Sequence, residues 1–202
     1  EGLRLCSGIH TNKRISKWFK VGGYGAYGFK DKEWKYGGDV DFLINYQRDI
    51  AFNFSAIKDV AEPGINEFYD YRVPMLSSAG NRMFYLSRMN NIDKIEGRLK
   101  FRTLRYLRVY LFANQENVAV TNNYHFKKVI GEDRFLEDQY YTFTEVGAEF
   151  RYAFKEKVIE TTGLRFVKTS KYPVLYARVQ QGINAFDGEY TYTKFSMRAE
   201  KN

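Results

Sequence analysis

The chain has 202 residues, 18% of them aromatic, and a formal net charge of +8 at pH 7. This length fits one domain or one large piece of a longer protein, and the aromatic content is typical of strand-rich architectures. The lone Cys6 excludes an intrachain disulfide and a cysteine-based zinc site, and the absence of any run of 18 apolar residues excludes a transmembrane helix.

The first predicted strand covers residues 3–10, where apolar and polar residues alternate. It contains Ser7 and His10, a nucleophile and a base that a hydrolase of the outer membrane could use. Residues three apart on a strand point to opposite faces, and the chain has no G-x-S-x-G motif, so we interpret both as a polar strand end. The second histidine, His125, lies far along the chain. A hydrolase would need the fold to bring a serine and a histidine together.

A glycine-rich stretch, VGGYGAYG, lies within the second predicted strand, residues 17–29. The spacing of Gly23, Gly25 and Gly28 matches G-x-G-x-x-G, but a dinucleotide site needs a helix after the last glycine, and here a charged turn and another strand follow. A kinase-type glycine loop would require catalytic motifs that the sequence lacks. We therefore interpret the glycines as structural, marking a bend, a bulge or the close approach of another chain segment, and expect no cofactor.

The clearest strand pattern covers residues 34–46. Its apolar face carries Trp34, Tyr36, Gly38, Val40, Phe42, Ile44 and Tyr46, and its polar face carries Lys35, Gly37, Asp39, Asp41, Leu43 and Asn45. Strands of soluble proteins average about 5–6 residues. Thirteen residues at about 3.3 Å each span roughly 40 Å, and a tilt near 45° reduces this to under 30 Å, the thickness of a hydrocarbon core.

In the middle of the chain, strands are predicted over residues 50–57, 82–88, 92–103 and 105–113, and short helical turns over 55–64 and 131–138. These turns are too short to organise an α/β fold.

A basic stripe runs through residues 92–103, where Lys94, Arg98, Lys100 and Arg102 alternate with apolar residues. Arg105 and Arg108 extend it. If the apolar residues face lipid, the cations face a lumen, or they meet lipopolysaccharide phosphates near a rim. We prefer a charge-balanced lining. No recognition helix or compact basic-aromatic motif supports nucleic-acid binding.

A second long pattern covers residues 140–154, with Val146, Ala148, Phe150, Tyr152 and Phe154 on one face and Glu145, Gly147, Glu149 and Arg151 on the other. In both long patterns, aromatic residues flank aliphatic ones, as in the girdles of transmembrane barrels. The predicted girdle residues are Trp34, Tyr36, Tyr46, Tyr140, Tyr152 and Phe154. The alternative is a long-stranded soluble barrel or sandwich with an aromatic core.

Paired carboxylates occur on the polar faces of these two segments. Asp39 with Asp41, and Glu145 with Glu149, could perform acid/base or glycosidase chemistry. We favour a lumen lining in which Lys35 and Arg151 balance these four carboxylates. No metal-ligand spacing is present, so we predict no catalytic and no metal site.

The last predicted strands cover residues 172–183 and 189–199, which gives about ten strands in all. The stretches TNKRISKWFKVGGYGAYGFKDKEWKYGGDV and TSKYPVLYARVQQGI…GEYTYTKFSM resemble a family of Bacteroidota outer-membrane proteins of unknown function. In that family a carboxypeptidase-regulatory-like domain precedes a C-terminal β-barrel. The resemblance implies that residues 1–202 are the barrel part of a longer chain, that the location is the outer membrane, and that there are no catalytic residues to carry over.

We therefore expect an all-β fold, an antiparallel transmembrane β-barrel of about ten long strands. The expected function is that of a non-enzymatic outer-membrane protein, either a pore or transport component or an accessory subunit of an assembly or secretion complex. Its expected partners are outer-membrane lipid, lipopolysaccharide, and other outer-membrane or periplasmic proteins. The alternatives are an outer-membrane hydrolase and a soluble ligand-binding β-barrel.

Overall fold

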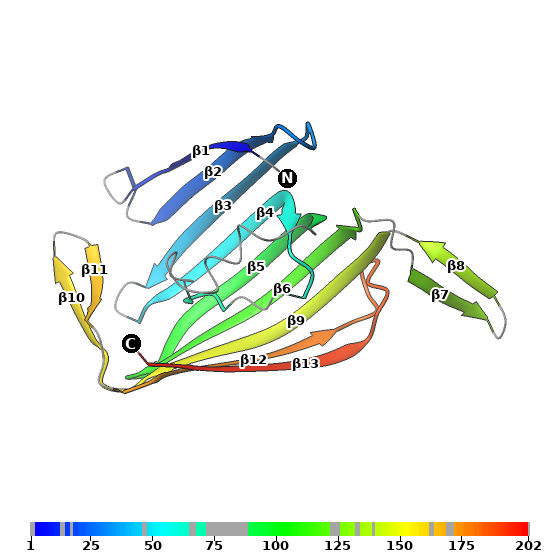
Figure 1. Ribbon diagram of the computed structural model, residues 1–202. Coiled ribbons are helices and arrows are strands. Elements are labelled where there is room, and N and C mark those ends of the chain that lie inside the picture. Colours follow the sequence, from blue (N-terminus) through cyan, green and yellow to red (C-terminus); the bar gives the residue numbers. More distant parts are fainter. Residues whose placement is uncertain are drawn as a thin grey trace.

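A computed structural model describes residues 3–12, 15–16, 18–45, 48–64, 68–71, 89–121, 126–131, 134–138, 140–161, 164–168 and 172–201 (Figure 1). Nine antiparallel strands form one sheet in the order β1-β2-β3-β4-β5-β6-β9-β12-β13, and two further pairs of strands form separate hairpins. The described residues contain no helix, and therefore none long and apolar enough to cross a membrane.

The strands of the main sheet are β1 (Arg4–His10), β2 (Phe19–Gly28), β3 (Trp34–Asn45), β4 (Ile50–Ala61), β5 (Asn90–Leu104), β6 (Leu107–Ala119), β9 (Tyr140–Ala153), β12 (Val174–Gly182) and β13 (Tyr192–Glu200). One hairpin pairs β7 (Phe126–Gly131) with β8 (Arg134–Asp138), and the other pairs β10 (Lys157–Thr161) with β11 (Leu164–Lys168). Five strands of the sheet have 12 to 15 residues, which agrees with the long strands expected from the sequence.

The two predicted helical turns are wrong. Residues 55–61 continue strand β4 and pair with β5 along their whole length, so that ladder hydrogen bonds override the helix-forming residues of this segment. Residues 134–138 form strand β8 instead of a turn. The sequence patterns also missed the β10–β11 hairpin. The predicted strand at residues 82–88 lies outside the described residues.

The connections of the sheet place its turns at two opposite ends. One end carries the β5–β6 turn and the β3–β4 turn, and the other carries the β2–β3 turn; we name them the β5–β6 end and the β2–β3 end. The two hairpins extend from opposite ends of the sheet (Figure 1). The edge strands β1 and β13 do not pair with each other, so the described sheet is open and is not closed into a barrel.

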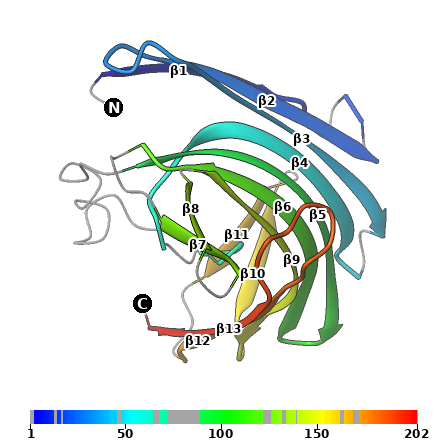
Figure 2. The same ribbon diagram turned by 90° about the vertical axis from the view of Figure 1, so that its right-hand side faces the viewer.

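The sheet curls around one of its faces, which we name the concave face (Figure 2). Most of the buried hydrophobic residues point to this side, namely Ala26, Ile92, Tyr110, Phe112, Val118, Ala153 and Tyr176. The opposite, convex face carries most of the large hydrophobic side chains that are exposed. In a soluble protein the more apolar face of a sheet is usually the covered one. Here the covered concave face mixes polar and apolar residues, and the more apolar convex face is the exposed one.

The glycines of β2 and β3 make room for large side chains on the concave face. A Cβ atom at Gly37 would lie 2.5 Å from the Tyr24 ring, and one at Gly22 would overlap the imidazole ring of His10. Tyr24 crosses Gly37 and donates a hydrogen bond to Asp59 at 2.5 Å. These glycines lie in paired strands with no helix after them, which agrees with a structural role.

Candidate functional site: the concave face and its inner segment

The six residues predicted to line a lumen all lie on the concave face. Glu149 is fully buried, Lys35 and Arg151 are nearly so, and Asp39, Asp41 and Glu145 are half-buried. The ion pairs of these residues reach partners outside the six as well. Lys35 pairs with Asp31, four residues earlier in the chain. Arg151 pairs with Glu156, and Glu149 pairs with Arg178 of β12.

The basic stripe of β5 is held by carboxylates of the same face. Glu96 lies 3.0 Å from Lys94 and 3.6 Å from Arg98. Asp49 lies 3.4 Å from Lys100 and 3.5 Å from Arg102. Most cations of the stripe therefore have a carboxylate partner, which agrees with the charge balance expected from the sequence. The lining of a lumen stays a prediction.

The predicted girdle residues lie near the two ends of the sheet. Trp34, Tyr36 and Tyr140 are exposed at the β2–β3 end, and Tyr152 and Phe154 lie at the β5–β6 end. At the β5–β6 end, Phe154 also packs edge-to-face on Tyr106 and Tyr172, with ring centroids 5.4 and 5.0 Å apart. Tyr46 lies outside the described residues.

Between these aromatic groups the convex face is apolar across the sheet. One row of neighbours consists of Phe42, Phe52, Leu99, Leu111, Ala148, Val179 and Phe195. A polar row of Lys58, Asp93, Asn117 and Thr142 bounds this region at the β2–β3 end. On β5 the apolar stretch lies between Asp93 and Thr103, which are roughly 33 Å apart at about 3.3 Å per residue, or roughly 25 Å after a tilt near 40°.

A short piece of the β4–β5 connection lies against the concave face. We name residues 68–71, with the sequence Phe-Tyr-Asp-Tyr, the inner segment. Phe68 is 6% exposed and packs against Tyr176, with ring centroids 5.4 Å apart. The Tyr69 ring packs on Tyr110 and Phe112 at 5.4 and 5.6 Å. The segment therefore fills the curve of the sheet opposite β6, β9 and β12.

Two guanidinium groups enclose the ring of Tyr69. Arg98 lies 4.1 Å and Arg178 lies 4.6 Å from the ring centroid. Cations over an aromatic face attract its quadrupole, and the attraction is stronger where water is excluded. Burial, followed by the nearby charge of Glu96, raises the pKa of the Tyr69 hydroxyl, so this side chain stays neutral.

Glu149 joins the inner segment to the sheet. Its Oε1 atom accepts a hydrogen bond from the backbone N–H of Tyr69 at 3.0 Å, and its Oε2 atom accepts one from Nε of Arg178 at 2.8 Å. A carboxylate with no exposed surface is tolerated only when charge and hydrogen bonds compensate it. The inner segment is part of that compensation.

Asp70 anchors the inner segment by charge. It accepts a hydrogen bond from Arg108 and lies 3.8 Å from Nε of Arg151. Burial alone would raise its pKa, but the positive charge of Arg108 and the hydrogen bond that Arg108 donates outweigh burial and lower the pKa. Asp70 is therefore a carboxylate at neutral pH.

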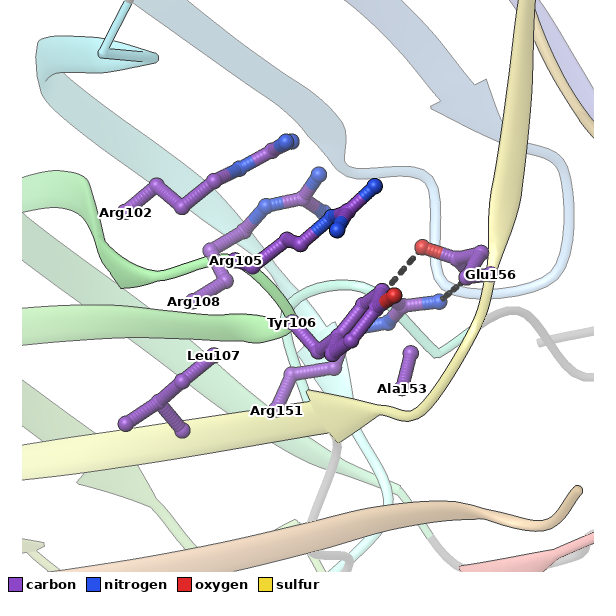
Figure 3. Close-up of a pocket in the computed structure, with 8 residues that line it drawn as sticks. All are labelled: Arg102, Arg105, Tyr106, Leu107, Arg108, Arg151, Ala153 and Glu156. Atoms are coloured by element: carbon purple, nitrogen blue, oxygen red, sulfur yellow. Dashed lines mark hydrogen bonds and ion pairs between the residues drawn. The ribbon is translucent and has the colours of Figure 1, made fainter.

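A small pocket lies at the β5–β6 end, beside Asp70. Arg102, Arg105, Tyr106, Leu107, Arg108, Arg151, Ala153 and Glu156 line it (Figure 3). Glu156 accepts two hydrogen bonds from Arg151. The other three arginines extend toward one region of this pocket (Figure 3).

The sequence patterns missed the inner segment. Its four residues show neither strand nor helix periodicity. The role of its carboxylate and its three aromatic rings becomes clear only when the arginines that they contact in the folded protein are known. One usable signal was the arginine excess on the polar positions of β5 and β6, which requires anionic or aromatic partners from elsewhere.

The geometry does not assemble the hydrolase site considered above. Ser7 lies opposite Gly25 and His10 opposite Gly22, so the two side chains point to opposite faces of the sheet. His10 instead lies 3.8 Å from Asp39. His125 lies outside the described residues. Within the described part of the chain, no group of three acidic, His or Cys residues is arranged to hold a metal ion.

A scan against protein-family models gave no match, and neither did searches of curated proteins and of solved structures.

Proposed function

We propose that the chain is an integral outer-membrane β-barrel protein, non-enzymatic, that acts as a transport component whose lumen is closed by the inner segment. The observation that supports this most strongly is the inverted distribution of polarity. An apolar, exposed convex face with a height of roughly 25 Å and aromatic ends suits lipid, whereas a soluble protein rarely exposes so continuous an apolar surface. The resemblance to a Bacteroidota outer-membrane family stays a prediction and points to the same location.

The inner segment supports a closed transport component over an open pore. It covers Tyr110, Phe112 and Glu149 at the centre of the concave face, where a solute would otherwise pass. The surrounding side chains are charged and polar, which favours small polar solutes once the segment moves. Its ion pairs and ring contacts are reversible, so displacement needs no change in the strands.

A second candidate function is that of an accessory subunit in an assembly or secretion complex, and the directions of the edge strands favour it. Every neighbouring pair in the nine-stranded sheet is antiparallel, so β1 and β13 run in the same direction. An antiparallel ladder that joins them needs an odd number of additional strands. Such strands can come from elsewhere in a longer chain or from a partner protein.

The membrane assignment is tested by expressing the protein in the outer membrane of a Gram-negative cell. Washing the membranes with alkaline carbonate removes peripheral proteins, and gels run with and without boiling detect a folded barrel. We expect retention in the pellet and a mobility shift, because a closed barrel satisfies its backbone hydrogen bonds internally. Release into the supernatant without a shift would favour the soluble ligand-binding alternative.

The plugged state is tested by conductance in planar bilayers. The wild-type protein should conduct little, and the double variant Tyr69→Ala/Asp70→Asn should conduct more, because it loses the ring contacts and the carboxylate of the inner segment. Asp93→Asn, on the convex polar row, is the matched control and should behave as the wild type. Equal conductance of wild type and double variant would favour the accessory-subunit function.

A further inference from the structure

The pocket at the β5–β6 end carries more positive charge than its ion pairs balance. Arg102, Arg105, Arg108 and Arg151 line it, and Lys100 shares Asp49 with two of them. The ion pairs of these five cations among the described residues reach three carboxylates, Asp49, Asp70 and Glu156. Asp49 alone serves Lys100, Arg102 and Arg108, at 3.4 to 3.5 Å from each.

Arg105 is the least compensated of these cations. It is exposed at the β5–β6 turn, and within the described part of the chain it has no carboxylate partner. Its guanidinium group lies 5.6 Å from the ring centroid of Tyr106, which orients the side chain without neutralising it.

The arrangement of the three arginines suits an anion with several oxygens. The guanidinium groups of Arg102, Arg105 and Arg108 gather in one region (Figure 3), and all three residues line the same pocket. Asp49 offsets part of the charge of Arg102 and Arg108, but with Arg105 added the three like charges still repel, and an anion between them would relieve that repulsion. A guanidinium group presents a planar fork of N–H donors that matches phosphate oxygens in pairs, which a lysine cannot do.

We propose that Arg102, Arg105 and Arg108 form a binding site for a phosphate monoester group. The site lies at one end of the sheet, outside the apolar region of the convex face, and two of its arginines, Arg102 and Arg105, are exposed. The phosphate can belong to a lipid headgroup or to a free phosphorylated solute. The inference depends only on this cluster and holds whether or not the sheet closes into a barrel.

The first experiment titrates detergent-purified protein with inorganic phosphate in chloride buffer by calorimetry. If the natural ligand is a free phosphorylated solute, inorganic phosphate should bind saturably, and its affinity should fall as the salt concentration increases. The variants Arg102→Gln and Arg105→Gln should each weaken binding about tenfold, since each loses charge-assisted hydrogen bonds. Arg105→Lys, which keeps the charge and loses the fork, should fall between. Both residues are exposed, so these changes leave the fold intact, whereas Arg108 holds Asp70 and is left unchanged.

The second experiment separates the lipid source from the free solute. Mixed micelles that contain lipid A with or without its phosphates are added to the same protein, and complexes are measured by native mass spectrometry. Preference for the phosphorylated form, lost in Arg102→Gln/Arg105→Gln, together with weak binding of inorganic phosphate, assigns the site to the headgroup.

The matched control is Lys30→Gln, an exposed cation at the opposite, β2–β3 end. It should bind like the wild type in both experiments. The proposal is overturned if neither probe binds the wild type, or if the double variant and Lys30→Gln bind phosphate as the wild type does. Membrane insertion is measured separately by the carbonate wash, so failure of this site leaves the proposed function standing.

Discussion

The convex and concave faces of the sheet are built from the same strands, yet they differ in what covers them. The convex row that contains Leu111 is apolar on all its seven strands, and nothing in the described structure covers it. The adjacent concave row runs through Asp41, Asn53, Arg98, Phe112, Gly147, Gln180 and Lys194. Side chains of the concave face pair with one another and with the inner segment.

This difference shows that the two faces are stabilised by different interactions. Burial of apolar area needs a nonpolar environment, which on the convex face has to come from outside the described chain. The concave face is stabilised by internal ion pairs, hydrogen bonds and ring contacts, each of which depends on its partners. A substitution on the concave face should therefore act through the partners it leaves unpaired, and one on the convex face through the environment outside the protein; four changes test this.

The largest effect is expected for Glu149→Ala on the concave face. The change leaves Arg178 without its buried counter-ion and the N–H of Tyr69 without its acceptor, so we expect a loss of about 3–5 kcal/mol in the free energy of unfolding. Denaturant titration of the protein in detergent measures it. The double variant Glu149→Ala/Arg178→Ala should recover part of the loss. Asp93→Ala, an exposed carboxylate, is the control, and an equal effect of both substitutions would contradict the assigned role of Glu149.

The next effect is expected for Leu111→Arg at the centre of the convex face. If this face contacts lipid, arginine near the bilayer midplane costs about 2–4 kcal/mol, whereas Thr103→Arg near the edge costs about 0–1 kcal/mol. Unfolding from lipid vesicles measures both. In a soluble protein an arginine at a position that is 44% exposed would change stability by about 0.5 kcal/mol or less. Equal values for the two variants would therefore remove the lipid assignment.

A smaller effect is expected for Gly37→Ala, which tests the close packing of the glycine-rich strands. The new Cβ atom would lie 2.5 Å from the Tyr24 ring, and overpacking of this kind typically costs about 1–3 kcal/mol. Gly25→Ala is the matched control, since no atom lies within 4 Å of its added Cβ. Thermal unfolding should separate the two variants. The double variant Gly37→Ala/Tyr24→Ala should reduce the loss that is due to the clash, and if it does not, the glycine has another role.

The sequence was sufficient to predict which residues share a face of the sheet. It was insufficient to predict which charged side chains form ion pairs. Period-2 alternation correctly placed Asp41, Glu149 and Arg151 on one side, because alternation is a local property of a strand. Pairing is not local. Arg178 of β12 pairs with Glu149 of β9, although the β10–β11 hairpin separates these two strands in the sequence. Even the pair of Lys35 and Asp31, four residues apart, depends on the conformation of the turn between β2 and β3.

The helical turn predicted at residues 55–64 failed for the same reason. The propensity of single residues does not include the neighbouring strand, and β5 supplies a ladder partner for each of residues 55–61. The inner segment was missed because an irregular segment has no period. Its position is set by Arg98, Arg108 and Arg178, on three different strands that only the fold brings together.

The smallest effect is expected from the protonation of Asp70. Its pKa is lower in the folded protein than the usual 3.8, so its contribution to stability is complete above that value and is lost as the pH falls through the folded pKa. The inner segment should therefore stay anchored from neutral pH down to about pH 4 and loosen below it. Conductance in planar bilayers at pH 7, 5 and 3 measures this.

Asp70→Asn distinguishes the effect of this carboxylate from the effects of Asp49 and Glu156, which pair with arginines of the same pocket. At pH 7 the variant should already show part of the conductance that the wild type gains only below pH 4, and it should gain less on acidification. The change stays small because Phe68 and Tyr69 keep ring contacts that do not titrate in this range. An equal response of variant and wild type to acid would show that another carboxylate, and not Asp70, holds the inner segment on the concave face.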